Sequence, residues 1–218
     1  MAKIAVLKER ASGEARVAAT AETVKKFVSL GATVSVETGA GLSAGVSDAD
    51  YTAAGAKIGS AADCLTKADI ILGVQGPEPK LLASAPKGAW VVASLDPFGQ
   101  RARVDAYAKA GVDALAMDFM PRITRAQSMD ILSSQSNLAG YKAVIDAAAA
   151  YGRAFPMMMT AAGTVSAARA FIMGVGVAGL QAIATAKRLG ARVEAFDTRP
   201  VVAEQVQSLG GPGHTALC

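Results

Sequence analysis

Cysteine, histidine and aromatic residues are scarce in this sequence, and each shortage excludes a class of protein. The two cysteines, Cys64 and Cys218, are too few for a disulfide framework or a zinc site, which indicates a reducing, cytosolic compartment. The single histidine, His214, lies in the last five residues, so imidazole chemistry has almost no place in this chain.

Long apolar runs and clustered charges are also missing. No stretch approaches the roughly 20 apolar residues of a membrane span, and the N-terminal residues lack the small-residue cleavage site of a secretory signal. The 22 Lys and Arg residues against 18 Asp and Glu give a net charge of +4 without a basic block. The sequence therefore predicts neither a direct membrane span nor binding of nucleic acid.

The composition is that of a folded α/β chain. Its 218 residues are 52% hydrophobic and 18% charged, which excludes disorder and allows one large domain or two small ones. Short β-favouring runs alternate with helical stretches, a pattern typical of parallel βαβ units. The expected strands are 3–7, 33–37, 69–74, 89–95 and 113–119. One helix is expected after an N-cap at Thr20, a second from a capping-box-like start at Ser47, and a third over 100–110.

The strongest motif is Gly174-Val-Gly176-Val-Ala-Gly179, which lies between a predicted strand and a predicted helix. In a dinucleotide-binding turn the first glycine permits the tight turn. The second lets the backbone approach a pyrophosphate, and the third lets helix and strand pack closely. The helix start, with Val177 and Ala178, offers unpaired N–H groups to the phosphates. A dinucleotide site is expected, with a purely structural turn as the alternative.

The next strand, 192–197, ends at Asp197, which lies 21 residues after Gly176. A carboxylate at this spacing accepts hydrogen bonds from ribose hydroxyls and repels a 2′-phosphate, so NAD(H) is expected rather than NADP(H). Thr198 and Arg199 follow directly, and the cation of Arg199 keeps an NADP(H) interpretation open.

A second polar group lies in the segment after residue 119. Arg122, Gln127, Asp130 and Ser133 supply a cation, an amide, a carboxylate and a hydroxyl that could grip a carboxamide and a ribose. The alternative is a solvated loop in which Asp130 caps the following helix, and the residues alone leave both open. The charges at 8–10 and Arg16, after the first strand, are equally ambiguous.

The domain organisation follows from these patterns. We predict an α/β fold of two Rossmann-like parallel-sheet domains joined by a long helix, the second of them incomplete. The expected segments are an N-terminal domain at 1–130, a linking helix at 131–155, and a first βαβ unit at 156–218 with an atypical tail at 212–218. The methionines at 157–159 are expected to serve packing rather than a ligand surface.

Three stretches resemble one family: RAQSMDILSSQSNLAGYKAVIDAA, FPMMMTAAGTV and GVGVAGLQAIATAKRLGA. They are similar to the NAD(H)-binding α subunits of proton-translocating nicotinamide nucleotide transhydrogenases. The N-terminal pattern KERxxGExRVA resembles the same family and the related alanine dehydrogenases. The resemblance covers positions 3 to about 210 of this chain.

The resemblance implies a role for each candidate residue. Arg122, Gln127, Asp130 and Ser133 would position the nicotinamide, and the cofactor-binding set would be Gly174, Gly176, Val177, Ala178, Gly179, Asp197, Thr198 and Arg199. The implied activity is Re/Si-specific hydride transfer from bound NAD(H) to NADP(H) on a membrane-embedded β subunit, coupled to proton translocation. A homodimer, peripheral on the cytoplasmic face of the inner membrane, is also implied.

An alanine dehydrogenase is the less favoured alternative. Those enzymes use a lysine in a V-K-x-P segment and a histidine after the fourth expected strand, where this chain has Val74-Gln75-Gly76-Pro77 and Leu95-Asp96-Pro97-Phe98. Oxidation of an amino acid needs a proton acceptor at the substrate carbon, whereas hydride transfer between two nicotinamides does not.

The C-terminal end departs from the family pattern. The resemblance implies subunits that continue for well over a hundred residues past this point. Residues 212–218 resemble nothing in the family. A truncated, inactive NAD-binding fragment is therefore a further alternative. We expect weak or undetectable NAD(H) binding by this chain alone, an unpartnered edge on the strand at 169–173, and early hydrogen exchange from about residue 161 onward.

Overall fold

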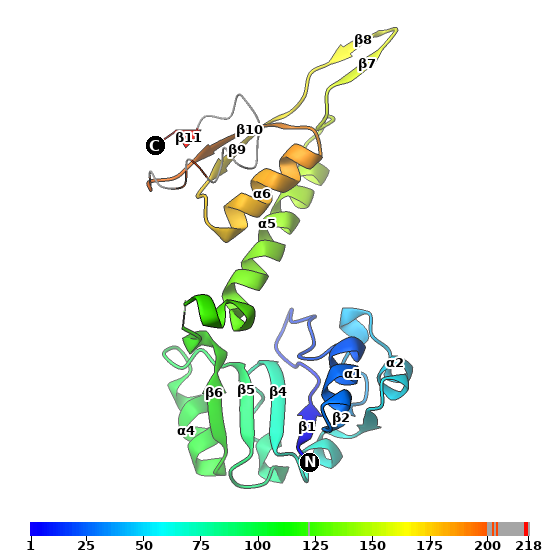
Figure 1. The fold of residues 1–218 in the computed structure, drawn as a ribbon, viewed down its shortest axis with the longest axis vertical. Coiled ribbons are helices and arrows are strands. Elements are labelled where there is room, and N and C mark those ends of the chain that lie inside the picture. Colours follow the sequence, from blue (N-terminus) through cyan, green and yellow to red (C-terminus); the bar gives the residue numbers. More distant parts are fainter. Residues whose placement is uncertain (122, 200–201, 203, 205–215, 218) are drawn as a thin grey trace. The chain divides into compact units, whose positions relative to one another are not determined.

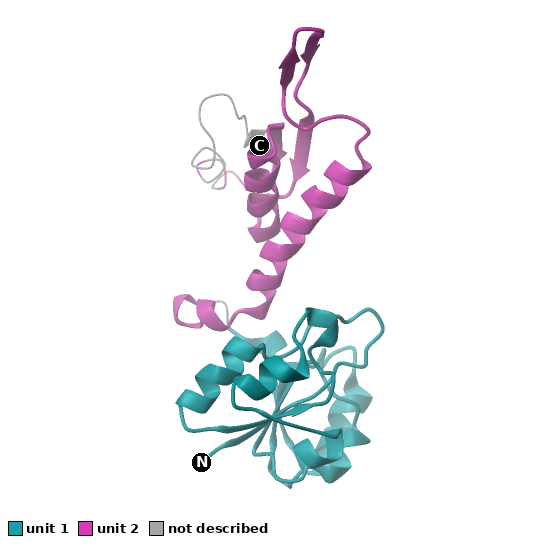
Figure 2. Cartoon of the chain, turned by 90° about the vertical axis from the view of Figure 1, so that its right-hand side faces the viewer, with its two compact units in different colours: residues 1–121 teal, residues 122–218 magenta. Residues whose placement is uncertain are grey.

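The computed structural model describes residues 1–121, 123–199, 202, 204 and 216–217. It divides into two compact units, Met1–Pro121 and Arg122–Cys218, shown in teal and magenta in Figure 2. The boundary expected after residue 130 falls after Pro121, so the segment that carries Gln127 and Asp130 belongs to the second unit.

Unit 1 contains one parallel sheet whose strand order is β3-β2-β1-β4-β5-β6 (Figure 1). Its strands are β1 (Lys3–Val6), β2 (Thr33–Glu37), β3 (Lys57–Gly59), β4 (Ile70–Gln75), β5 (Trp90–Ser94) and β6 (Asp113–Ala116). Doubly wound dinucleotide-binding folds have a sheet with this strand order. The topological switch point, from which the chain adds strands toward opposite edges of the sheet, lies between β1 and β4. The expected parallel sheet is confirmed; β3 was not predicted, because three residues are too few to show a periodic pattern.

Four helices accompany this sheet: α1 (Ala21–Ser29), α2 (Asp48–Ala53), α3 (Ala61–Leu65) and α4 (Arg101–Ala110). The expected caps of the first two are confirmed, since Thr20 accepts from the backbone of Thr23 and Ser47 forms a capping box with Asp50. The same box, Ser60 with Asp63, begins α3, which was not predicted. Short 3-10 helices lie at Leu42–Ala44, Leu81–Ser84 and Met117–Phe119.

Unit 1 buries both faces of its sheet. Along β1, Ile4 and Val6 belong to one core cluster, whereas Ala5 and Leu7 belong to the other. Successive side chains of a strand point to opposite faces, so each cluster marks one face. A parallel sheet covered on both sides explains why these strands are apolar nearly throughout.

Unit 2 begins with a 3-10 helix at Thr124–Met129 and the 20-residue helix α5 (Ile131–Ala150). The hairpin β7 (Met158–Thr160) and β8 (Gly163–Val165) follows, then β9 (Arg169–Met173), α6 (Val177–Arg188), β10 (Arg192–Phe196) and β11 (Ala216–Leu217). The last three strands form a parallel sheet in the order β11-β10-β9. The strand–helix–strand prediction is confirmed, and β11 was missed because two residues carry no pattern.

Helix α5 packs on α6 within unit 2, as both figures show. A Cβ added at Gly140 of α5 would come within 2.1 Å of the Ala178 carbonyl oxygen in the first turn of α6. The Asn137 amide donates to Gln181 at 3.3 Å, also between these helices. The two helices therefore approach as closely as a glycine permits.

The sheet of unit 2 is covered unevenly. Ile183 of α6 and Val193 of β10 lie in the core with Val144 of α5. On β9, however, Phe171 is 52% exposed and Met173 is 77% exposed. Among the described residues, β9 pairs only with β10, so its other edge has no strand beside it.

The β7–β8 hairpin stands away from the body of unit 2 in both views (Figures 1 and 2). Met157, Met158 and Met159 are 56%, 51% and 73% exposed. The expected packing role of these methionines therefore finds no cover among the described residues. They lie on or next to a hairpin whose six strand residues are all exposed.

Candidate functional site

The glycine-rich turn joins β9 to α6 and has the backbone that the motif predicts. Gly174 adopts a φ of 92°, a left-handed conformation that a side chain would strain, and its N–H donates to the Phe196 carbonyl at 2.8 Å. Gly176 is the N-cap of α6, and no acidic residue lies in the first helical turn. Like any helix start, this turn exposes N–H groups that have no partner within the helix.

The other two glycines have opposite surroundings. A Cβ at Gly179 would lie 1.8 Å from the Gly174 carbonyl oxygen, so this position tolerates only glycine. At Gly176, by contrast, no atom of the described residues other than its own and those of its two chain neighbours lies within 4 Å of such a Cβ. The turn thus closes tightly on its own helix and leaves open space where a phosphate can approach the backbone.

Asp130 caps helix α5. Its carboxylate accepts from the backbone of Leu132 at 2.9 Å and of Ser133 at 3.1 Å, and from the Ser133 hydroxyl at 2.6 Å. The helix-cap interpretation of Asp130 is therefore confirmed as a structural role. Gln127 lies on the preceding 3-10 helix with its side chain exposed, and Arg122 lies outside the described residues.

One groove of about 950 Å³ connects the start of α5 with the glycine turn. Ser133 and Ser136 line it from α5, and the turn contributes Gly174 and the residues 176–179. The far end is apolar, with Tyr151 and Phe155 edge-to-face at 5.9 Å. Ser133 is thus brought to the same groove as the dinucleotide motif, whereas Asp197, Thr198 and Arg199 do not line it.

Asp197 follows β10 and is almost fully buried, although Thr198 and Arg199 beside it are exposed. Its carboxylate accepts from the Val175 N–H at 2.8 Å and from Arg199 through the backbone and the guanidinium. The hydrogen bonds from Arg199, and then that from Val175, hold the pKa of Asp197 far below its ordinary value. Asp197 is therefore ionised at neutral pH.

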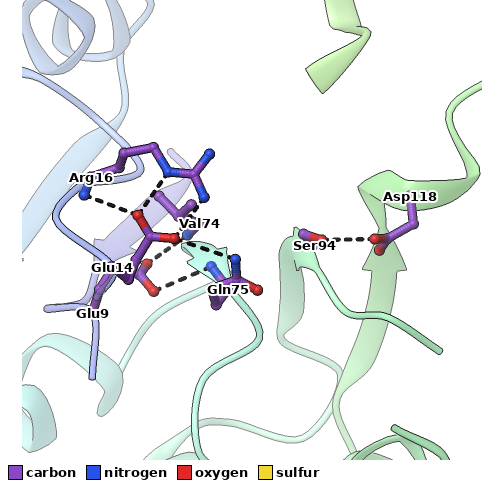
Figure 3. Close-up of polar contacts among 7 residues, drawn as sticks. All are labelled: Glu9, Glu14, Arg16, Val74, Gln75, Ser94 and Asp118. Atoms are coloured by element: carbon purple, nitrogen blue, oxygen red, sulfur yellow. Dashed lines mark hydrogen bonds and ion pairs between the residues drawn. The ribbon is translucent and has the colours of Figure 1, made fainter. Parts of the chain in front are cut away.

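A separate polar cluster lies at the carboxyl ends of β1 and β4 in unit 1 (Figure 3). Glu9 accepts from the backbone N–H groups of Val74 at 2.6 Å and Gln75 at 3.2 Å. Burial raises the pKa of Glu9, while these two hydrogen bonds act in the opposite direction. Glu9 therefore serves as an acceptor for the end of β4.

Glu14 pairs with Arg16 in the same cluster. One carboxylate oxygen accepts from the Arg16 Nε at 2.7 Å, and the other accepts from Nη2 at 2.6 Å and from the Gln75 amide at 3.3 Å. These bonds, led by those from Arg16, lower the pKa of Glu14 to about 2. The ambiguity over Arg16 is partly resolved, since it is an ion-pair partner at the edge of the sheet.

Asp118 was missed by the sequence analysis. It accepts from the Ser94 hydroxyl at 2.7 Å and from the Leu95 N–H at 2.7 Å, and so joins the ends of β5 and β6 (Figure 3). The expected strand 113–119 had placed Asp118 inside a strand, whereas β6 ends at Ala116 and leaves Asp118 just beyond the carboxyl end, the edge that parallel strands share.

Comparison with known proteins identifies the family of this chain. Residues 5–139 match the family model for the alanine dehydrogenase/PNT N-terminal domain, and residues 143–215 match the corresponding C-terminal domain. The chain is 57% identical over 215 residues to a Rhodospirillum rubrum protein named as the first portion of NAD(P) transhydrogenase subunit alpha, covering 96% of this chain and 56% of the relative. The protein of the same name from Rickettsia prowazekii is 50% identical over 95% of this chain and 56% of its own length.

A solved structure, the transhydrogenase from Sinorhizobium meliloti, superposes with a TM-score of 0.93 at 55% identity. It covers 99% of this chain, and this chain covers 64% of it. The chain thus spans a little over half the length of the curated relatives it matches. In the described residues, no helix is both long and apolar enough to cross a membrane. The chain belongs to the alanine dehydrogenase/PNT family of oxidoreductases, and within it the chain is similar to transhydrogenase α subunits.

Proposed function

We propose that this chain is the NAD(H)-binding component of a proton-translocating NAD(P) transhydrogenase and that unit 2 holds NAD(H) at the glycine turn. The observation that carries the proposal is the turn itself. Gly174 has a left-handed backbone, Gly176 faces open space and Gly179 is closed against the Gly174 carbonyl, all at the start of α6. These are the three conditions of a pyrophosphate-binding turn.

When NAD(H) is bound it supplies the hydride, and the chain's own residues hold and orient it. The free N–H groups at the start of α6 fit the pyrophosphate. Arg122, Gln127, Asp130 and Ser133 would orient the nicotinamide. Their contribution is alignment and exclusion of water, since transfer between two nicotinamides needs no acid or base at the reacting carbons.

The names of the relatives support a proposal about partners. A protein named as one portion of a subunit alpha implies that further subunits exist. We assign NADP(H) to a membrane-embedded β subunit, which would couple the Re/Si-specific transfer to proton movement. This chain would act as a homodimer on the cytoplasmic face of the inner membrane.

Chemical-shift titration of the ¹⁵N-labelled chain with NADH and NADPH tests the site. Shifts at the turn and at Asp197 are expected, with NADH binding more tightly. The technique detects millimolar dissociation constants, which suits the weak binding expected of this chain. Absence of shifts at the turn with about 10 mM NADH would overturn the proposed site.

Hydride transfer tests the loop. In the chain mixed with membranes that hold the partner subunits, Asp130→Asn and Gln127→Ala should slow NADH-dependent reduction of an NADP⁺ analogue strongly, with a smaller effect on NADH affinity. Ser134→Ala, on the exposed first turn of α5, is the matched control. A change within about twofold, under 1 kcal/mol of transition-state free energy, would leave Asp130 as a helix cap only.

A second candidate function, dinucleotide binding without turnover, is favoured by the edge of β9 that pairs with no strand among the described residues, and by the exposed Phe171 and Met173. The same transfer assay distinguishes it, because a chain of this kind binds NADH without reducing the analogue. An alanine dehydrogenase activity is disfavoured, since the Gln75 amide, a group that cannot accept a proton, takes the place of the lysine.

A further inference from the structure

The carboxylate of Asp197 has no acceptor position left for a ribose hydroxyl. A carboxylate offers about four lone-pair sites, two on each oxygen. Oδ1 accepts from the Arg199 backbone N–H at 2.9 Å and from its Nε at 3.0 Å. Oδ2 accepts from the Val175 N–H at 2.8 Å and from the Arg199 Nη2 at 3.0 Å. All four sites are therefore used.

The four donors differ in how easily they can leave. Two are the backbone N–H groups of Val175 and Arg199, whose positions are fixed by the path of the main chain. The other two belong to the Arg199 guanidinium, whose side chain is 58% exposed while that of Asp197 is 8% exposed. A ribose hydroxyl can reach the carboxylate only if the guanidinium moves away.

The position of the guanidinium bears on the choice between NAD(H) and NADP(H). Its Nη2 also lies 3.4 Å from the Val175 carbonyl oxygen, so the cation bridges the glycine turn and the end of β10. Once displaced, it stays tethered two residues from Asp197, next to the ribose position. A guanidinium there attracts a 2′-phosphate, whereas the carboxylate alone repels it.

We propose that Arg199 is a specificity-determining residue that competes with the ribose hydroxyls for the Asp197 carboxylate and so narrows the preference for NAD(H) over NADP(H). The proposal rests on the proposed function, because it deepens the same site. Arg199 weakens NAD(H) by competing with the ribose hydroxyls for Asp197, and it strengthens NADP(H) by pairing with the 2′-phosphate.

The test compares Arg199→Ala with the unchanged chain in chemical-shift titrations with NADH and NADPH. We expect NADH to bind about threefold more tightly and NADPH several-fold more weakly, so that the ratio of the dissociation constants widens about tenfold. Arg199→Lys keeps the charge without the two-point contact and should improve NADH binding while retaining NADPH. Arg192→Ala removes an exposed cation at the other end of β10 and should leave the ratio unchanged.

An unchanged or narrower ratio in Arg199→Ala would overturn the proposal. A second readout does not need nucleotide: the ¹³C shift of the Asp197 carboxyl, followed against pH. Its pKa should rise towards the ordinary value in Arg199→Ala, and no change would show that Arg199 does not occupy the carboxylate. If neither nucleotide binds any variant, the proposed function and the competition both fail, while the carboxyl titration still reports on the contact itself.

Discussion

Units 1 and 2 are built from the same strand–helix–strand element, yet they bury it differently. In unit 1 both faces of a six-stranded sheet are covered, and Val34, Ile71 and Val91 are fully buried. In unit 2 the described sheet has three short strands, and residues of α5 and α6 share one core cluster with it. Alternate residues of β9 nevertheless remain exposed. Apolar burial is the main source of folding free energy, so unit 1 should be the more stable unit.

The glycine turn of unit 2 takes its shape beside a sheet of three described strands, half the number in the large sheet of unit 1. Its geometry depends on contacts within one turn of α6, chiefly Gly179 against Gly174. The shape of the turn is local, whereas its stability depends on how well the rest of unit 2 is covered.

The largest expected effect comes from Gly179→Ala. The added methyl group would lie 1.8 Å from the Gly174 carbonyl oxygen. Neither group can move aside on its own, because the backbone of the turn sets the positions of both. We expect unit 2 to lose at least about 3 kcal/mol, enough to unfold it, while unit 1 stays folded. Amide hydrogen exchange of α6 and β10 measures the loss, and fluorescence of Trp90, the single tryptophan, reports on unit 1.

Gly176→Ala is the matched control, since its methyl group enters open space. It should change the stability of unit 2 by less than about 1 kcal/mol while weakening dinucleotide binding. Equal destabilisation by the two substitutions would contradict the assigned roles of these glycines.

A pair of isoleucines sharpens the difference between the units. Ile71→Ala in β4 removes a fully buried side chain and should cost unit 1 about 3 kcal/mol. Ile172→Ala in β9, where the side chain is only partly buried, should cost unit 2 about 1 kcal/mol. Urea unfolding followed by Trp90 fluorescence and by amide exchange gives both values; similar costs would mean that β9 is covered in solution.

Much of this fold could be predicted from the sequence where patterns are long. The caps at Thr20 and Ser47, the strand Arg169–Met173 and the helix start at Val177 agree with expectation. The short elements β3 and β11 could not be predicted, because two or three residues show no period. The exposure of the methionines at 157–159 could not be predicted, because hydrophobicity leads to burial only when some other element is available to cover the side chain.

The contacts made by the candidate site residues could not be predicted from the sequence. Spacing identified Asp197 as the acidic partner of the turn, yet nothing in the spacing shows that Arg199 takes up its acceptor positions. Asp130 was correctly offered as a helix cap. Its contribution to nicotinamide binding remains a prediction.

Acid should weaken unit 1 through Glu14. Its folded pKa of about 2 lies below the ordinary 4.5, so the stabilisation is complete above pH 4.5 and fades as the pH falls towards 2. Arg16 is 45% exposed, so solvent screening reduces the effect to about 1 kcal/mol. Trp90 fluorescence in urea at several pH values measures it. Glu14→Gln should flatten this dependence, whereas Glu22→Gln, at an exposed pair on α1, should preserve it.

The smallest expected effect is that of Met159→Ser in the hairpin. The residue is 73% exposed, so the unfolding free energy of unit 2 should change by less than about 0.5 kcal/mol. Val193→Ser, at a buried position of β10, provides the contrast in the same assay. A loss above about 1 kcal/mol at Met159 would show that the hairpin is packed against another surface in solution.

The contact between Gly140 and Ala178 fixes the distance and the angle at which Ser133, at the start of α5, lies from the glycine turn. Ser133 at its start and Gly140 at the contact are seven residues apart, about 10 Å along the helix and close to two full turns. Inserting one residue between them would rotate Ser133 by about 100° and lengthen the separation by about 1.5 Å. Insertions or deletions in this stretch should therefore be far less tolerated than substitutions, because they change the angle and distance between the polar start of α5 and the glycine turn.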